Sequence, residues 1–172
     1  MAKFEAQLPT DILKDVDFLA KNAVEIFGGM TKAGAEVAAE NMKQRARKAL
    51  KSNIAGAVAN KIKVTKTYET KKREIATAAR AYGYVPKKDG KPFVLKKNGK
   101  TYTYNQGVPA PLLLNLADQG KSIASTMVPQ FRDYWMGIKY PIVIPAFADT
   151  QGIEAAMLKA QEKLSGGLLK ND

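Results

Sequence analysis

The first fifty residues carry two series of apolar residues that recur every three or four positions, which is the pattern of amphipathic helices. The first series consists of Ile12, Val16, Leu19, Ala23 and Ile26 or Phe27. It predicts a helix that begins near Thr10 and ends at Gly28 and Gly29, because paired glycines favour a helix end. The second series is rich in alanine and predicts a helix over about residues 31–50, suited to close packing against another helix. A short strand is expected before both, over residues 3–7.

The pattern changes from Lys61 onward to an alternation of apolar and polar residues, which is typical of half-exposed strands. The alternating apolar positions are Ile62, Val64 and Tyr68. The next stretch, residues 73–86, is ambiguous because its alanines favour a helix and its end at residues 82–85 favours a strand. We interpret it as a strand.

A hairpin is the clearest local feature of the chain. Asn98 and Gly99 form the preferred pair for a two-residue type I′ turn. The turn predicts a register of Phe93 opposite Tyr104, Leu95 opposite Tyr102 and Lys97 opposite Lys100. One face of this hairpin is therefore apolar and aromatic, and we expect its tyrosines to belong to the core.

Two further helices are predicted in the last third of the chain. Pro109 and Pro111 stand at the start of a short apolar series and Gly120 stands after its end, which predicts a short buried helix. A final amphipathic series predicts a helix from about residue 149 to Gly166. The intervening residues 121–140 have no regular pattern.

The run KYPIVIPAF, residues 139–147, is apolar without alternation. Ile142, Val143 and Ile144 are consecutive, so a strand built from them must be covered on both faces. Pro141 and Pro145 limit the run and exclude a central position in a sheet. Two interpretations stay open: a strand that docks against a neighbouring subunit, and an ordinary internal strand.

The order of helices, a strand meander and further helices predicts a single α+β domain over residues 1–172. Its parts are an N-terminal strand and helices (2–60), a basic meander (61–106) and a segment with a short helix, a loop, a short strand and the C-terminal helix (107–172).

Charge is concentrated in the middle of the chain, whose formal net charge is +12. Residues 40–104 hold 18 Lys and Arg against four Asp and Glu, whereas the rest holds 10 against 12. Such a block indicates an anionic partner, either nucleic acid or an acidic protein surface. Asp89-Gly90 predicts a second turn, so lysines gather at two turns. These candidate contact residues are Lys87, Lys88, Lys91, Lys97 and Lys100. Solubility and protection of the strand edge against aggregation are the alternative explanation for these lysines.

Common catalytic groups are absent from the sequence. There is no cysteine and no histidine, which excludes thiol nucleophiles, Cys/His zinc sites and the commonest general base. Residues 98–101 end like a phosphate-binding loop, but Val94 occupies the position of the required glycine. We therefore expect no enzyme activity, no cofactor and no metal site. No run approaches the roughly 18 apolar residues of a membrane span, and no signal peptide is evident.

Nucleic-acid binding is the alternative function. Tyrosines interleaved with the cations could stack on bases while lysines contact phosphates. These tyrosines are Tyr68, Tyr82, Tyr84, Tyr102 and Tyr104.

Several motifs, in order, resemble the small neck proteins of long-tailed bacteriophages, the tail-completion, head-tail joining or gene-product-ten-like family. The first 43 residues are similar to that family's strand, short helix, glycine break and long helix. LLNLADQGKS resembles its motif through Leu116, Asp118 and Gly120, although Gln119 replaces an aromatic residue. The closing pattern is matched by Pro141, Pro145 and Ala146, with aliphatic residues 142–144 in place of more aromatic and basic ones.

The resemblance implies a non-catalytic structural protein of the virion, assembled in the host cytoplasm. Its copies would form a ring, six-fold or alternatively twelve-fold, between the portal or connector and the tail tube. Expected neighbours are other neck, connector and tail-tube or tail-terminator proteins, with DNA passing through the channel. We expect the subunit contacts on the small-residue helix, on the meander edge and at Ile142, Val143 and Ile144.

Overall fold

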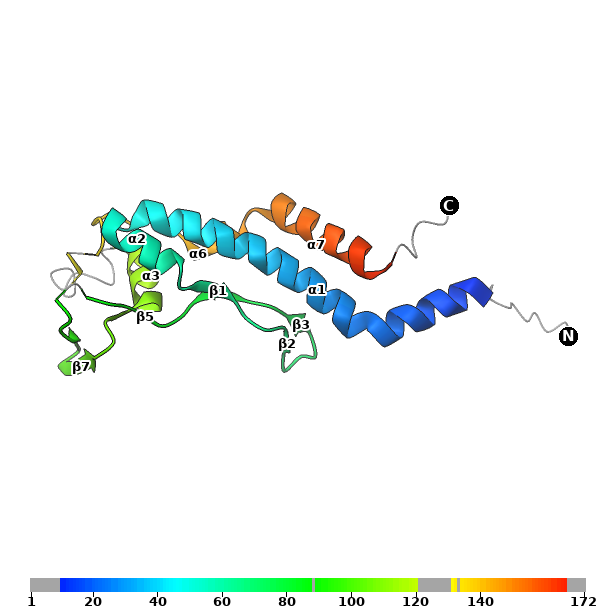
Figure 1. Cartoon of the computed structure of the whole chain (residues 1–172), viewed down its shortest axis with the longest axis horizontal. Coiled ribbons are helices and arrows are strands. Elements are labelled where there is room, and N and C mark those ends of the chain that lie inside the picture. Colours follow the sequence, from blue (N-terminus) through cyan, green and yellow to red (C-terminus); the bar gives the residue numbers. More distant parts are fainter. Residues whose placement is uncertain (1–9, 88, 121–130, 133, 167–172) are drawn as a thin grey trace, which may run out of the picture.

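The computed structural model describes residues 10–87, 89–120, 131–132 and 134–166. It confirms a mixed α+β architecture (Figure 1). The helices are α1 (Thr10–Ala49), α2 (Ser52–Ala59), α3 (Ala110–Gln119), α6 (Val143–Phe147) and α7 (Thr150–Leu164). The strands are β1 (Ile62–Val64), β2 (Tyr68–Glu69), β3 (Ile75–Ala76), β4 (Ala79–Ala81), β5 (Tyr84–Val85), β6 (Phe93–Lys97), β7 (Lys100–Tyr104) and β8 (Val108–Pro109). They form four antiparallel pairs, β1–β4, β2–β3, β5–β8 and β6–β7.

Helix α1 is continuous over 40 residues, so the predicted helix end at Gly28 and Gly29 is wrong. These glycines are sites of close packing. A Cβ on Gly28 would lie 3.3 Å from the Thr67 side chain, and one on Gly29 would overlap the side chain of Leu164. Tertiary contacts at the two positions favour a residue without a side chain, and they outweigh the weak helix propensity of glycine.

Helix α7 lies antiparallel along α1 (Figure 1). Gly29 of α1 meets Leu164 near the end of α7, whereas a Cβ on Gly34 would lie 3.1 Å from both Ile153 and Met157. Gly29 and Gly34 of α1 therefore accept α7. The alanine-rich series that was predicted to pack against another helix is instead mostly buried in the core of the same subunit, so it is not available for the expected contact between subunits.

The hydrophobic core lies at the C-terminal half of α1, where α2, α3 and the strands β1, β4, β5 and β8 surround it. Its largest fully buried side chains are Phe131, Met42, Leu113, Leu116, Ile142, Val58, Val85 and Val108. The alanine stripe of α1 contributes Ala38, Ala39, Ala46 and Ala49. Burial is therefore concentrated at one end of the longest helix.

The β6–β7 hairpin has the predicted register, with Phe93 opposite Tyr104 and Lys97 opposite Lys100. Asn98 and Gly99 both have positive φ, 51° and 72°, as a type I′ turn requires. The expectation that its tyrosines are core holds only in part. Tyr104 is half-buried, with its ring centroid 6.2 Å from that of Phe93, whereas Tyr102 is 43% exposed.

Residues 139–147 do not form the predicted strand, because residues 143–147 are the short helix α6. Pro145 is the third residue of this helix, where its missing N–H costs no intrahelical hydrogen bond. Helix α3 starts after Pro109 and ends before Gly120 as predicted, and α7 begins after Asp149, which caps it. The expected strand over residues 3–7 lies outside the described residues, as do residues 121–130 of the stretch without a regular pattern.

Candidate assembly surfaces

The residues that resemble the neck-protein motifs meet in one packed unit. Leu116 is buried in α3, and the amide of Tyr140 donates to the carbonyl of Ala117 at 2.9 Å. Gly120 has a φ of 63°, and a Cβ there would lie 2.6 Å from the Cβ of Lys139. The end of α3 therefore packs directly on the chain that enters α6.

Asp118 connects these two motifs through hydrogen bonds. One oxygen of its carboxylate, Oδ1, accepts from the amide of Ile142 at 2.6 Å and from the amide of Val143 at 3.2 Å. These amides precede and begin α6, where backbone N–H groups have no partner within the helix. A carboxylate from α3 therefore caps α6, and this explains why an aliphatic run forms a helix.

Two further contacts hold the proline-flanked segment on α1. Arg45 donates from Nη1 to the carbonyl of Pro141 at 3.0 Å, and its guanidinium lies 5.7 Å from the ring centroid of Tyr140. Ala146 is fully buried, and Asn41 donates to its carbonyl at 3.4 Å. Pro145 is half-buried in the same segment.

The three aliphatic residues predicted to be covered have different environments. Ile142 is fully buried, Val143 is 37% exposed and Ile144 is 80% exposed. A helix turns its side chains through 100° per residue, so one covered side is enough. Ile142 is therefore a core residue, and only Val143 and Ile144 remain available as contact residues.

The lysines at the two turns differ in how far they are exposed and in whether they form an ion pair. Lys87 is half-buried and its Nζ lies 3.3 Å from Oδ2 of Asp89. The amide of Lys91 donates to Oδ1 of Asp89 and, with Lys87, lowers the pKa of that carboxyl below its ordinary value. Lys91, Lys97 and Lys100 are exposed, and within the described ranges no ion pair involves them. Lys88 lies outside the described residues.

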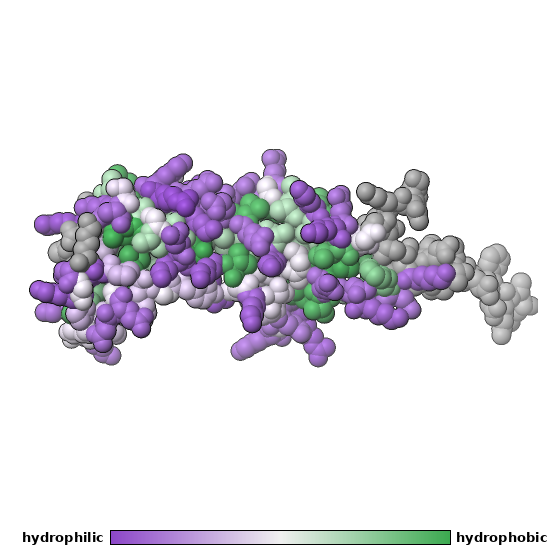
Figure 2. Space-filling view, in the orientation of Figure 1, coloured by the Kyte–Doolittle hydropathy of each residue, from purple (hydrophilic) through white to green (hydrophobic). Residues whose placement is uncertain are grey.

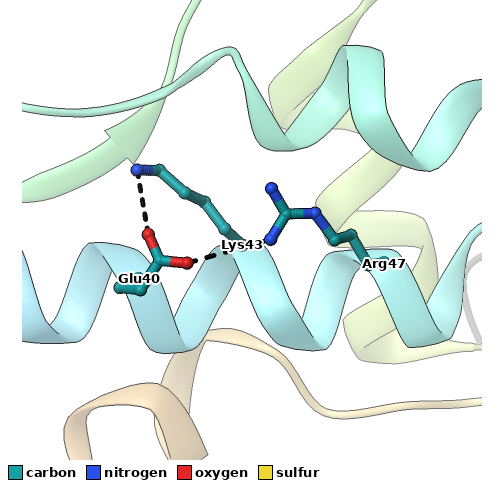
Figure 3. Close-up of polar contacts among 3 residues, drawn as sticks. All are labelled: Glu40, Lys43 and Arg47. Atoms are coloured by element: carbon teal, nitrogen blue, oxygen red, sulfur yellow. Dashed lines mark hydrogen bonds and ion pairs between the residues drawn. The ribbon is translucent and has the colours of Figure 1, made fainter.

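Part of the positive charge on α1 is neutralised on the helix itself (Figure 3). Glu40 accepts from Lys43 at 3.2 Å through Oε2, and Nη1 of Arg47 lies 3.8 Å from Oε1. Two cations share one carboxylate at half-exposed positions, so this cluster supports the helix and retains a single positive charge.

A surface that the sequence analysis did not identify lies at the N-terminal end of α1. We call residues 14–27 the α1 arm. In Figure 1 this end of α1 extends past α7 and past the β2–β3 pair. Apolar side chains remain exposed along it, and hydrophobic residues also reach the surface near its base in Figure 2. The exposed residues are Val16 (56%), Phe18 (37%), Leu19 (46%), Val24 (72%) and Phe27 (52%). The apolar period was visible in the sequence, but it did not reveal that most of the larger residues of this series stay exposed while Ile26 is buried.

A groove of about 510 Å³ lies beside the Asp118 unit, between α1, β4, α3 and α6. We call it the α3 groove. Its lining includes Met42, Arg80, Ala81, Tyr82, Leu114 and Val143. Arg80 stands directly opposite Lys63 in the β1–β4 pair, and both are exposed. The groove is therefore apolar at its base and positively charged along one edge.

No helix in the described part of the chain is long and apolar enough to cross a membrane. Among the same residues, no group of three or more carboxylates is placed to hold a metal ion. Comparisons with protein-family models, with curated proteins and with solved structures found no match to this chain.

Proposed function

We propose that this protein is a structural component of the neck of a long-tailed bacteriophage, where copies of the chain form a ring that joins the head connector to the tail tube. The proposal includes a non-catalytic role and a place in the virion. It starts from the sequence resemblance to the neck-protein family, and the observations below support it.

The observation that carries the proposal is the packing of the resemblance motifs on one another. Asp118 and Gly120 belong to one motif, and Pro141 and Ala146 to another, more than twenty residues away. The first motif caps and packs on the second. The residues that match the family pattern contact one another in the folded chain. Such matches support a fold shared with that family more strongly than matches scattered over separate parts of the structure would.

Unpartnered surfaces of two kinds support an assembly role. Ile144 and the α1 arm expose apolar side chains, which in soluble monomers rarely form extended patches unless a partner covers them. The exposed lysines at the hairpin turn are suited to an acidic neighbouring ring. A ring requires one surface of each copy to meet a different surface of the next, and this elongated subunit offers several different surfaces.

The test begins with the mass of the purified chain in native mass spectrometry, with a closed ring as the expected result. A Lys91→Glu, Lys97→Glu, Lys100→Glu variant should fold normally and fail to join heads to tails in a phage that carries it. Lys159→Glu is the matched control, because Lys159 is an exposed lysine on α7 away from the turns. Normal infectious particles from the triple variant would show that the lysines at the turns are not needed for joining heads to tails. Phage necks that do not contain this chain would refute the proposed function as a whole.

Non-specific DNA binding is the second candidate, and one observation favours it. Tyr68, Tyr82 and Tyr102 are each exposed by more than 40% within the basic meander, so base stacking on them is sterically open. The test is binding to DNA as salt is varied. Each phosphate contact contributes about −0.9 to the slope of log K against log salt on duplex DNA, so the triple variant should make that slope shallower by about 2.7. Absence of binding at low salt would exclude this function.

A further inference from the structure

We infer that the α1 arm of one copy docks in the α3 groove of a neighbouring copy, and that Asp17 of the arm then faces Arg80 and Lys63 at the groove's edge. The inference rests on the self-assembly proposed above and assigns it a specific pair of surfaces.

Most of the exposed apolar residues of the arm form one continuous face. Positions 16, 20, 23 and 27 of a helix lie within a narrow sector at 100° per residue, with positions 19 and 24 on its two flanks. Ala20 is exposed and Ala23 is half-buried, and the larger residues of this face are all exposed. The opposite side holds Lys14, Phe18, Lys21 and Glu25, three of them charged. The arm is therefore amphipathic, and its apolar side is suited to docking in a groove.

The arm and the groove have complementary charges. Residues 10–27 hold four acidic against two basic residues, in contrast to the strongly basic segment 40–104. Asp17 lies two helical turns from Val24, at the border of the apolar face. Arg80 and Lys63 are like charges directly opposed across two strands, an arrangement that destabilises the pair until an anion approaches. Asp118 also lines the groove, but its carboxylate already accepts two amide hydrogen bonds within its own chain.

The arm cannot reach the groove of its own chain. Met42 lines the groove and belongs to the same continuous helix as Val24. Eighteen residues of helix separate them, which is roughly 27 Å at 1.5 Å per residue. A second copy is therefore the occupant that the charges and the apolar face both fit. The two surfaces differ, so the arm of each copy can enter the groove of the next copy around a ring, which is a heterologous contact.

Cysteine cross-linking tests the contact directly, since the chain has no cysteine of its own. Val24→Cys and Tyr82→Cys are made as separate proteins, both at exposed positions, and then mixed under mild oxidation. A disulfide needs Cα atoms within about 7 Å, so a mixed dimer, linked between positions 24 and 82, is expected only if the arm of one copy reaches the groove of another. Leu158→Cys, on an exposed apolar residue of α7, replaces Val24→Cys in the matched control and should give no such dimer.

Charge exchange gives an independent measurement. Asp17→Arg and Arg80→Asp should each weaken self-association by roughly tenfold, and the double variant should restore most of it.

Three results would each overturn the inference: absence of the mixed dimer, a preferred disulfide between two copies of the Val24→Cys variant, or a chain that stays monomeric. A mass that shows a closed ring, without the cross-link between positions 24 and 82, would refute this interface and leave the proposed function standing. The cross-link in a chain that is absent from phage necks would support this interface and refute the proposed function.

Discussion

Replacing Asp118 with alanine should destabilise the chain by about 2 kcal/mol. The carboxylate accepts from the amides of Ile142 and Val143 at 2.6 and 3.2 Å. Loss of a helix cap costs typically about 1 kcal/mol. The amide of Ile142 belongs to a residue that is fully buried, so water cannot readily replace the lost acceptor, and a buried unsatisfied N–H costs about 1–3 kcal/mol.

The position of Asp118 makes this prediction specific. It is the last-but-one residue of α3, where the negative end of the helix dipole disfavours an acid. Removing the charge should therefore slightly favour α3 and strongly disfavour α6. A net loss of about 2 kcal/mol means that the cap dominates, and in a chain of this length it corresponds to a fall in Tm of about 4–8 °C.

Urea unfolding followed by tryptophan fluorescence is the assay. Trp135 is the single tryptophan, is buried, and donates from Nε1 to the carbonyl of Ile138 at 2.9 Å, so it reports on the segment that leads to α6. Asp118→Asn keeps an oxygen acceptor and should lose less than half as much stability as Asp118→Ala. Glu154→Ala, at an exposed acid of α7, should stay within about 0.5 kcal/mol. An alanine variant as stable as the wild type, or an asparagine variant equally damaged, would refute the capping argument.

Three further expectations follow from burial, backbone and charge, and urea titration with circular dichroism measures all of them. Ile142→Asp should unfold the chain because it places a carboxylate in the core, whereas Ile144→Asp, at an 80% exposed position, should leave a folded subunit; equal effects would contradict the α6 geometry. Gly120→Ala should lower the free energy of unfolding by at least about 1 kcal/mol, because the φ angle of Gly120 is 63°. Gly56→Ala, at a position in α2 with open space around it, should raise the free energy of unfolding by about 0.5–1 kcal/mol. Lys100→Glu should stabilise the hairpin by roughly 0.2–1 kcal/mol at low salt, because it turns a like-charged cross-strand pair into an attractive one; no change with salt would count against this.

Local chemistry was enough to predict several elements. The turn at Asn98 and Gly99 determined the register of β6 and β7, because a type I′ turn has one backbone solution. Pro109 and Gly120 bracketed α3 for the same kind of reason. Lys87 differs from the exposed lysines of the turns, because its partial burial and its pairing with Asp89 depend on how the turn folds.

The candidate contact residues were harder to predict, because exposure is decided by neighbours far away in the sequence. Nothing local distinguishes Ile142 from Ile144, yet one is fully buried and the other almost fully exposed. The apolar face of the α1 arm has the same period as a buried stripe, and only the positions of distant segments show that Val16, Leu19, Val24 and Phe27 stay exposed in the described part of the chain.

Local sequence patterns were sufficient to predict the β6–β7 hairpin and the limits of α3 and α7. The uneven distribution of charge could also be read directly from the sequence. Contacts between distant segments settled whether Gly28 and Gly29 would end a helix and whether residues 143–147 would form a strand. Thr67 and Leu164 pack against the glycines, and the helix continues through them. Asp118 supplies an acceptor for two amides that a strand would have paired elsewhere. Such contacts can outweigh local preferences of about 1 kcal/mol, which is why no local pattern revealed either outcome.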